Sequence, residues 1–316
     1  MTLLLTESDV ESVLDFPSVI ESVEQAFRQQ AGGLATNHAR RRVMTPSSGL
    51  NVMFAGAPEM GSMGLKAYSI SRSGARFYVM LFDASTGELL AIVQADRLGQ
   101  MRTGAASAVA TRYLARPDAR TLGIYGAGWQ AEAQLEAIAC VRDLERVVVY
   151  SRTGESRRAF AERMSERTGL EVEPVSSAEE PAAQDIVVTI TSSREPVLRG
   201  EWLSPGSHVN AAGSNFLYKS EIDRDTVRRS SLVCIDSREE IGLEAGSLLP
   251  SLDTGVLFPE AVHELSEVVA GRIRGRRGPE DVTLFVSQGI ALEDVATARL
   301  VYDRALEQNL GRDVDL

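Results

Sequence analysis

The feature that most constrains this chain is a short apolar run that meets two glycines and continues as a helix. Residues 122–125 have the composition of a buried strand, and Gly126 and Gly128 follow directly. Apolar residues then recur at helical spacing from Ala131, so the order is strand, Gly-x-Gly-x-x-Ala, helix. The first glycine permits a tight turn, the second admits a pyrophosphate, and the alanine allows close packing of helix on strand. We predict a dinucleotide-binding turn; the alternative is a simple strand-to-helix connection.

The next strand carries a clue to which nucleotide would bind. Residues 146–150 are rich in β-branched side chains, and an NAD site is expected to place Asp or Glu just after such a strand. Ser151, Arg152 and Thr153 stand there instead. A guanidinium pairs bidentately with a phosphate, so the sequence favours NADP(H), with NAD(H) left open. The alternative is a solvated arginine in a surface turn.

Strands and helices alternate through the rest of this region, which predicts an α/β fold with a doubly wound parallel sheet. Further buried strands are expected at 185–190, 207–212, 231–235 and 282–287. Asp236 and Ser237 are expected to cap a helix after the third of these.

The region before the glycine turn has a different pattern, that of an antiparallel sheet. A first amphipathic helix is expected to begin at Pro17 and to end at Gly32-Gly33. Five strands should follow, with a hairpin turn between the last two, at about 39–45, 50–56, 63–70, 76–83 and 88–95. A long helix over about 96–115 then leads to the glycine turn.

The last helix, 290–306, is expected to return to the N-terminal region, which makes that domain discontinuous. We therefore predict an α+β substrate-binding and dimerisation domain from residues 1–118 and 289–316. Residues 119–288 would form the nucleotide-binding domain.

Composition narrows the classes of partner. The chain has 316 residues and a formal net charge of −11, which argues against general affinity for nucleic acid or anionic membranes. No apolar run has transmembrane length, and the first residues lack the basic segment of a signal peptide. Cys140 and Cys234 stand in apolar contexts typical of reduced thiols, so we expect a cytoplasmic protein. The three histidines share no ligand spacing, so no metal is expected.

Lysine is rare in this chain: of 33 basic residues only Lys66 and Lys219 are lysines. Lys66 lies among apolar neighbours in an expected strand, and burial of an ammonium lowers its pKa toward neutrality. Such an amine suits proton transfer to or from an amine or imine. The equally weighted alternative is a lysine at a strand edge that reaches solvent.

Three arginines could accompany this lysine. Arg40 and Arg42 should share one face of a strand, with Arg41 on the other. Arg102 precedes a run of small residues, 104–108, that would let its helix pack closely on another element. Two arginines converging with a lysine would bind a carboxylate, although each arginine alone is more often a surface ion pair.

Six motifs in one order give the chain a family resemblance. They are Gly64-Leu-Lys66-Ala-Tyr, Arg102-Thr-Gly-Ala-Ala-Ser, Gly126-Ala-Gly-Trp-Gln130, Thr189-Ile-Thr-Ser-Ser, Asn210-Ala-Ala-Gly-Ser-Asn215 and residues 284–294. Together, over about residues 1–310, they resemble the ornithine cyclodeaminase/μ-crystallin family, in its reductase-like branch. The resemblance implies a Rossmann domain that binds NAD(P), a second domain that dimerises through its sheet, and an amino or imino acid bound between them.

The resemblance also suggests roles, position by position. Arg40 and Arg102 look like the carboxylate-binding pair, with Arg42 as the alternative to Arg40, and Lys66 looks like the group beside the reacting C–N bond. The expected cofactor contacts are Thr103, Gly126, Ala127, Gly128, Trp129, Gln130, Ser151, Arg152, Thr153, Thr191, Ser192 and Ser287. Further expected substrate contacts are Asn215, Gln288 and Gly289. The μ-crystallin branch carries Arg-Thr after its second strand and uses NADPH, which agrees with Arg152-Thr153.

One departure from the family pattern bears on the reaction. Cyclodeaminases carry a catalytic Asp where this chain has Asn215, and a carboxamide has no titratable proton near neutral pH. The expected activity is therefore NADP(H)-dependent reduction of a small imino acid, such as a pyrroline- or piperideine-2-carboxylate. The alternatives are an ornithine or lysine cyclodeaminase, an alanine-type amino acid dehydrogenase, and a non-catalytic protein that binds NADPH and a small ligand.

Overall fold

The computed structural model describes residues 1–315, and the chain divides into two compact units. Unit 1 comprises Met1–Arg102 and Gly289–Leu316, and unit 2 comprises Thr103–Gln288. The sequence prediction placed these junctions after residues 118 and 288. Helix α3 (Asp96–Leu114) runs through the first junction, so its first turns belong to unit 1 and the remainder to unit 2.

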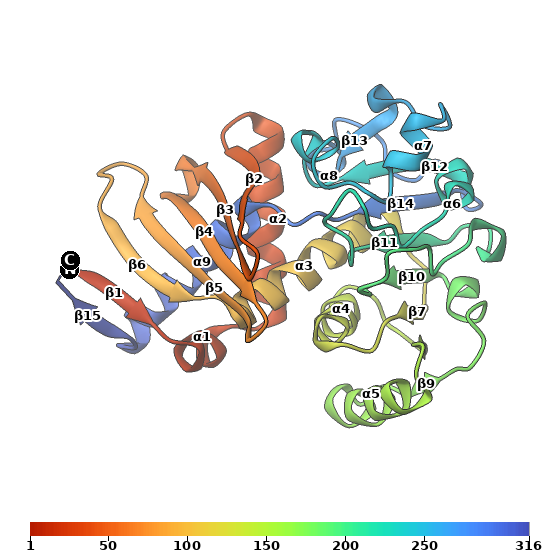
Figure 1. Ribbon diagram of the computed structural model, residues 1–316, viewed down its shortest axis with the longest axis horizontal. Coiled ribbons are helices and arrows are strands. Elements are labelled where there is room, and N and C mark those ends of the chain that lie inside the picture. The colour runs from red at the N-terminus through yellow and green to blue at the C-terminus, as the bar shows by residue number, and fades with distance from the viewer. Residues whose placement is uncertain (316) are drawn as a thin grey trace. The chain divides into compact units, whose positions relative to one another are not determined.

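Unit 1 is built on a seven-stranded sheet in the order β15-β1-β6-β5-β4-β3-β2 (Figure 1). Strands β2 to β6 pair antiparallel in chain order, as predicted. Strand β1 adds to β6 in parallel, and the C-terminal β15 closes this edge. The strands are β1 (Thr2–Leu5), β2 (Thr36–Met44), β3 (Ser48–Ala57), β4 (Ser62–Ser71), β5 (Gly74–Asp83), β6 (Leu89–Gln94) and β15 (Arg312–Val314), with the turn η1 (Pro58–Met60) before β4.

Three helices complete unit 1: α1 (Glu7–Val13), α2 (Phe16–Gly32) and α9 (Ala291–Gln308). Helix α2 begins where Asp15 accepts a hydrogen bond from the Ser18 amide, and it ends at Gly33 in the left-handed conformation, as favoured by its two glycines. The C-terminal α9 packs on α2, β3 and β4, so its predicted return to the N-terminal region is confirmed.

The central strands of unit 1 present two different faces. Met53, Lys66 and Val79 lie opposite one another in the ladder and are all buried. Phe54 and Tyr78 point the other way and stay exposed. The register of β3, β4 and β5 therefore decides which side chains enter the core of unit 1.

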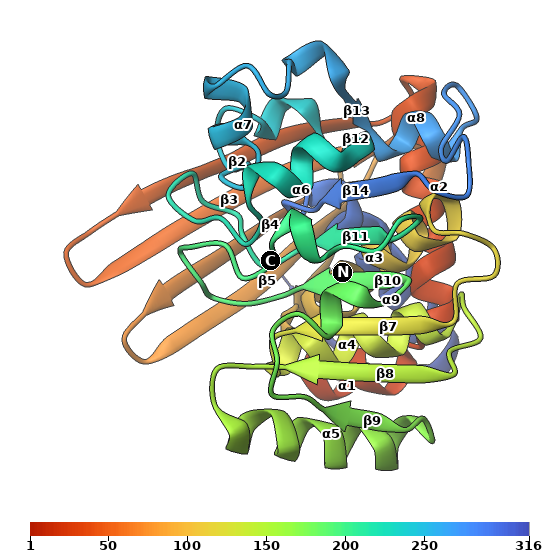
Figure 2. The ribbon, with the colours of Figure 1, turned by 90° about the vertical axis from the view of Figure 1, so that its right-hand side faces the viewer.

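Unit 2 contains an eight-stranded parallel sheet in the order β13-β12-β14-β11-β10-β7-β8-β9 (Figure 2). The chain runs outward from β7 through β8 to β9 and then returns to β10 on the other side of β7, which makes this the point of topological reversal. The strands are β7 (Thr121–Tyr125), β8 (Arg146–Tyr150), β9 (Val172–Pro174), β10 (Ile186–Thr189), β11 (His208–Ala211), β12 (Ser230–Ile235), β13 (Val262–Glu264) and β14 (Val282–Val286).

The helices of unit 2 after α3 are α4 (Trp129–Ala139), α5 (Gly154–Thr168), α6 (Arg224–Arg229), α7 (Leu249–Asp253) and α8 (Leu265–Val269). Single turns stand at η2 (Pro181–Ala183), η3 (Gly200–Trp202), η4 (Arg238–Glu240) and η5 (Pro259–Ala261). The helix expected after Asp236 is thus only the turn η4, and Ser237, at its start, makes no side-chain capping bond.

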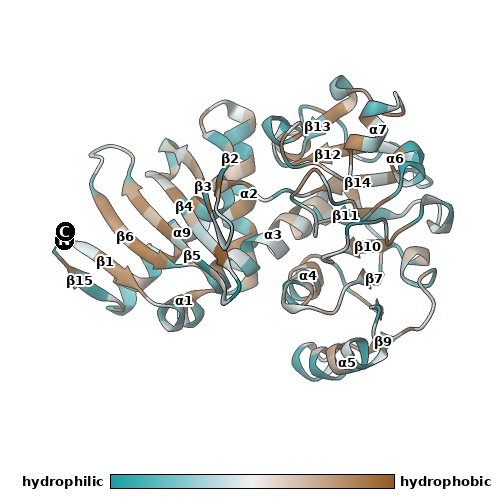
Figure 3. Cartoon of the chain, in the orientation of Figure 1, coloured by the Kyte–Doolittle hydropathy of each residue, from teal (hydrophilic) through white to brown (hydrophobic). Residues whose placement is uncertain are grey.

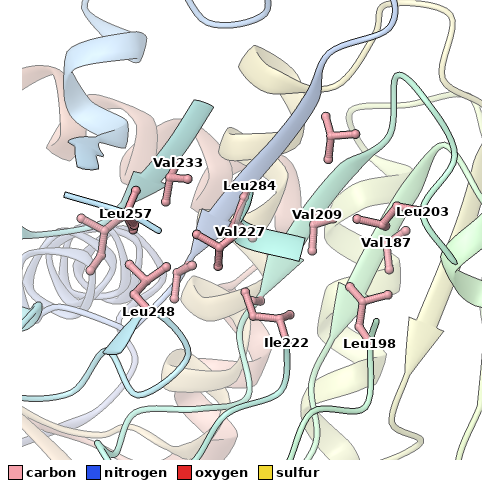
Figure 4. Close-up of a cluster of buried hydrophobic side chains, with 14 of the residues drawn as sticks. Val187, Leu198, Leu203, Val209, Ile222, Val227, Val233, Leu248, Leu257 and Leu284 are labelled. Atoms are coloured by element: carbon pink, nitrogen blue, oxygen red, sulfur yellow. The ribbon is translucent and has the colours of Figure 1, made fainter. Parts of the chain in front are cut away.

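The central strands β10, β11 and β14 of the parallel sheet are buried on both faces, and most of their residues are apolar (Figure 3). In β10, Ile186 and Val188 enter the core on the side of α4 and α5. Val187, between them, enters the core on the opposite side, with Leu203 and Leu284 (Figure 4). The predicted α/β class, with a doubly wound parallel sheet and a discontinuous second unit, is confirmed. Among residues 1–315, no helix has the length and apolar character needed to cross a membrane.

Gly123 offers a test of the packing of β7. A Cβ at this position would overlap the backbone of Pro181 in η2, which cannot move away as a flexible side chain could. We expect Gly123→Ala to lower the free energy of unfolding by about 1–3 kcal/mol, the usual effect of overpacking, and to lower the thermal midpoint by several degrees.

The matched control is Gly278→Ala, because nothing lies within 4 Å of its added Cβ. Calorimetry of both variants makes the comparison. Equal midpoints for the two variants would contradict the close approach of η2 to β7.

Candidate functional site

A buried cluster of charged side chains lies within unit 1. The Lys66 Nζ donates to Asp294 Oδ1 at 2.7 Å, and the Arg102 Nε donates to the same oxygen at 3.0 Å. Arg102 also pairs with Glu293 at 2.8 Å. All four side chains are buried, with Asp294 and Glu293 fully so. One carboxylate oxygen thus holds the lysine and the arginine side by side.

The elements that carry this cluster explain its position. Lys66 lies on the buried face of β4, Arg102 on α3, and the two acids in the first turn of α9. Glycines leave the necessary room: a Cβ on Gly99 would lie 3.1 Å from the Lys66 Nζ, and one on Gly289 would lie 2.5 Å from the Arg102 Nη1. Gly289 also has a φ of 74°, a conformation that favours glycine.

Arg40 joins the cluster, and Arg42 is placed differently. The Arg40 Nη2 donates to the Gly289 carbonyl at 3.0 Å, and its guanidinium lies 5.8 Å from the centre of the Tyr68 ring. Arg40 is 5% exposed, whereas Arg42 is only half-buried. Arg42 lies opposite the buried Asn51 and Arg41 opposite Val52, so Arg40 and Arg42 share the buried side of β2 as expected, and the register shift of this strand lies before Arg41.

The environment of Lys66 changes its acidity. Burial lowers the pKa of the Lys66 ammonium to about 8, with Arg102 and Arg40 acting in the same direction and Asp294 opposing them. The Phe77 ring lies 5.3 Å from Nζ. Lys66 is therefore mostly a cation at neutral pH, yet it gives up a proton far more readily than an exposed lysine. The reading of Lys66 as a solvent-facing edge lysine is wrong.

The glycine turn of unit 2 has the geometry expected for binding a nucleotide. Gly126 has a φ of 115°, and a Cβ there would overlap the Ile190 carbonyl, so only glycine fits. Helix α4 begins at Gly128 without a side-chain cap. Its first N–H groups can therefore bond phosphate oxygens at the positive end of the helix dipole. The residues present fit a dinucleotide.

The other predicted cofactor residues of unit 2 gather at the same edge of the sheet, except Thr103, which lies on α3. Because the strands are parallel, the segments after β7, β8, β10 and β14 all emerge at their carboxyl ends. They carry Ala127, Trp129, Gln130, Ser151, Arg152, Thr153, Thr191, Ser192 and Ser287. Trp129 and Arg152 are exposed, and the Arg157 Nη1 donates to the Ser151 carbonyl at 2.9 Å.

Two buried carboxylates organise this edge, and neither role was predicted. Glu221 accepts hydrogen bonds from the Thr191 amide and hydroxyl and from the Gly213 amide, which ties the segments after β10 and β11 together. Its burial raises its pKa, and these hydrogen bonds oppose the rise. The Asp236 carboxylate accepts a hydrogen bond from the main-chain N–H of Gln288 at 2.7 Å and so fixes the segment after β14.

The remaining predicted residues fall in unit 2. Asn215 is half-buried in the segment after β11. The Gln288 side chain, oriented so that both ends of its amide are satisfied, donates to the carbonyls of Glu244 and Ser214.

His208 is buried between Thr283 and Asn210, and burial lowers its pKa to about 3. A histidine held neutral in this way is a core residue.

The structure thus brings Lys66, Arg40, Arg102 and Gly289 together in unit 1 and the nucleotide residues together in unit 2. Sequence reasoning missed Glu293 and Asp294. The available signal was a pair of adjacent acids near the start of the expected last helix. Acids are common in a first helical turn, so this signal is weak by itself.

Comparisons with known proteins agree with this geometry. A family model described as ornithine cyclodeaminase/mu-crystallin family matches residues 1–309. The Delta(1)-pyrroline-2-carboxylate reductase of Bacillus cereus is 39% identical over 239 residues, which cover 75% of this chain and 73% of that protein.

Solved structures extend the similarity to the whole chain. The Thermococcus litoralis Delta(1)-pyrroline-2-carboxylate reductase in complex with NADH and L-proline has a TM-score of 0.93 and 36% identity, covering 99% of this chain and 100% of that one. An archaeal alanine dehydrogenase dimer with bound NAD has a TM-score of 0.93 and 33% identity, covering 99% of each chain. These relatives are oxidoreductases. This chain is likewise an NAD(P)-dependent oxidoreductase, and it belongs to the ornithine cyclodeaminase/mu-crystallin family.

Proposed function

We propose that this protein reduces the C=N bond of a small imino acid, such as pyrroline- or piperideine-2-carboxylate, to the corresponding amino acid. The observation that carries the proposal is the buried cluster of Lys66, Arg102 and Arg40. These three cations accompany two carboxylates, Asp294 and Glu293, so the five side chains have a formal charge of +1. One substrate carboxylate would balance that charge, and guanidinium groups match its shape.

Each group of the cluster has a definite part in this reaction. Arg102 and Arg40 bind the carboxylate and orient the adjacent C=N carbon, while Lys66 donates a proton to, or hydrogen-bonds, the imine nitrogen. The second oxygen of Asp294 is buried and has no hydrogen-bond partner among residues 1–315, so it can accept an N–H of the substrate. When bound, a nicotinamide nucleotide would supply the hydride for the imine carbon, and the proton on nitrogen would complete the balance.

The nucleotide we favour is NADP(H). Ser151, Arg152 and Thr153 lie at the carboxyl end of β8, where a ribose 2′-substituent is expected, and none of them is an acid. The Thermococcus litoralis and archaeal relatives were solved with NADH and NAD, so the preference of this chain depends on these three residues.

We also propose a homodimer that forms through the sheet of unit 1. The face of β2 to β5 that points away from α9 exposes large apolar side chains where an antiparallel sheet open to water is usually polar. They are Val43, Leu50, Phe54, Met63 and Tyr78. The dimeric archaeal alanine dehydrogenase supports the proposal.

Reductase activity can be tested with NADPH and a panel of cyclic and acyclic imino acids. We expect turnover of at least one, and a loss of about 10²- to 10⁴-fold in kcat/KM for Lys66→Met, the range for removal of a general acid. Lys219→Met, which alters the other lysine, is the control.

The same assay separates the alternatives. Ammonia release from ornithine without added cofactor would indicate a cyclodeaminase, and reductive amination of pyruvate would indicate an alanine-type dehydrogenase. Tight NADPH binding with no turnover of any substrate would overturn the reductase in favour of a binding protein.

Cofactor preference is tested by Arg152→Ala. Loss of a charged hydrogen bond to phosphate removes about 1.5–3 kcal/mol, so we expect the Kd for NADPH to rise about tenfold or more, with little change for NADH. Arg146→Ala is a matched control, because Arg146 lies at the other end of the same strand and pairs with Glu173. Isothermal titration gives both constants, and parallel losses for the two nucleotides would contradict the assignment.

The dimer is tested by Phe54→Asp, which places a charge in the proposed interface. We expect light scattering to report the mass of one chain instead of two. Phe258→Asp is the control, since Phe258 is an exposed apolar residue of unit 2. A Phe54→Asp protein that keeps the mass of two chains would exclude this face.

A further inference from the structure

Asp294 stands out because it does two things with one atom. Its Oδ1 accepts from both the Lys66 Nζ and the Arg102 Nε, while the whole side chain is excluded from solvent. A carboxylate that only balanced charge could pair with either cation. Sharing one oxygen fixes the distance and direction between the two cations.

We propose that Asp294 is a positioning residue that keeps the Lys66 amine charged and aims it alongside Arg102. This part is played by Oδ1 and is separate from the substrate N–H that the second oxygen can accept. The proposal deepens the proposed function and rests on it for the identity of the reaction, but the state of the Lys66 amine is a property of the protein alone.

Among the groups around Lys66, Asp294 is the one that keeps the amine protonated. Burial, Arg102 from α3 and Arg40 from β2 all favour the neutral amine, and the Phe77 ring of β5 lies nearby. Asp294 of α9 opposes them through both its charge and its hydrogen bond. Glu293, the next residue on the helix, pairs with Arg102. Without Asp294, two guanidinium groups and a buried site would leave about half or more of the Lys66 amines neutral at pH 7.

Loss of the Asp294 charge would lower the pKa of Lys66. The pKa of Lys66 is about 8 with the carboxylate present, so the amine carries its proton at neutral pH. Removal of an opposite charge at hydrogen-bond distance lowers the pKa of an amine, by about one pH unit or more. A lysine that is neutral at pH 7 has lost the proton that an imine nitrogen needs.

The scarcity of lysine makes a direct measurement practical. A protein labelled with ¹³C at the lysine ε-carbon gives signals from only two residues, Lys66 and Lys219. Lys219→Arg identifies the Lys66 signal, and its titration is then followed by NMR without any substrate or turnover.

We expect Asp294→Asn, which keeps the shape and removes the charge, to move the Lys66 titration midpoint down by about one pH unit or more. Glu293→Gln is the matched control: it removes the same charge one residue earlier, from a carboxylate paired with Arg102, and should produce a clearly smaller shift. An Asp294→Asn midpoint that matches the wild type, or equal shifts in both variants, would overturn the proposal.

A measurement on the wild type covers the case in which Asp294→Asn does not fold. An ammonium held by Asp294 exchanges its hydrogens with water slowly, so the Lys66 ¹⁵Nζ signal below pH 8 should persist where that of the half-buried Lys219 is lost. Equal exchange for both lysines would overturn the proposal. If an imino acid is turned over, the pH at which kcat/KM declines should fall in Asp294→Asn as the NMR midpoint does. If none is, the proposed function fails while the titration result stands.

Discussion

The ion pair between Lys66 and Asp294 is the constraint to which the rest of unit 1 is fitted. Its two residues are 228 positions apart in the chain, and they meet only because the last helix returns to the sheet that holds the lysine. A buried pair of this kind is costly to desolvate and adds little net stability. Its value therefore lies in the protonation and orientation of the amine, not in holding the fold together.

Buried carboxylates also hold groups in place in unit 2, where they bind the segments that follow the strands. Glu221 holds the segments after β10 and β11, and Asp236 holds the segment that follows β14. Main-chain groups just beyond the ends of parallel strands have no partners in the sheet, so they need such acceptors to keep one conformation. The loops that would meet a nucleotide are thus fixed by side chains behind them, and their own side chains stay available for binding.

Much of this arrangement could be predicted from the sequence because it depends on local patterns. Alternating apolar residues and glycine turns predicted the two sheets. The turn at Gly126 has the positive φ that glycine favours. Long-range contacts were less accessible. Asp294 and Glu221 find their partners in distant segments, and no spacing along the chain marks that.

The differences in detail have equally physical causes. The register of β2 shifts between His38 and Arg41, and an irregularity of one residue leaves no trace in an alternating pattern. Asp236 resembles a helix cap in sequence, but its carboxylate accepts the Gln288 amide instead. In the second case a tertiary contact overrides a local capping preference.

The two faces of β4 limit how this protein can change over evolution. Lys66 lies on the buried face, and its neighbours Leu65 and Ala67 lie on the outer one, so the strand contributes to the core and to the opposite surface at once. A single inserted or deleted residue within β4 would exchange the faces and send the amine outward. Length variation among descendants of this sequence should therefore be confined to the connections at 45–47, 58–61, 72–73 and 84–88, while the strand itself accepts only substitutions.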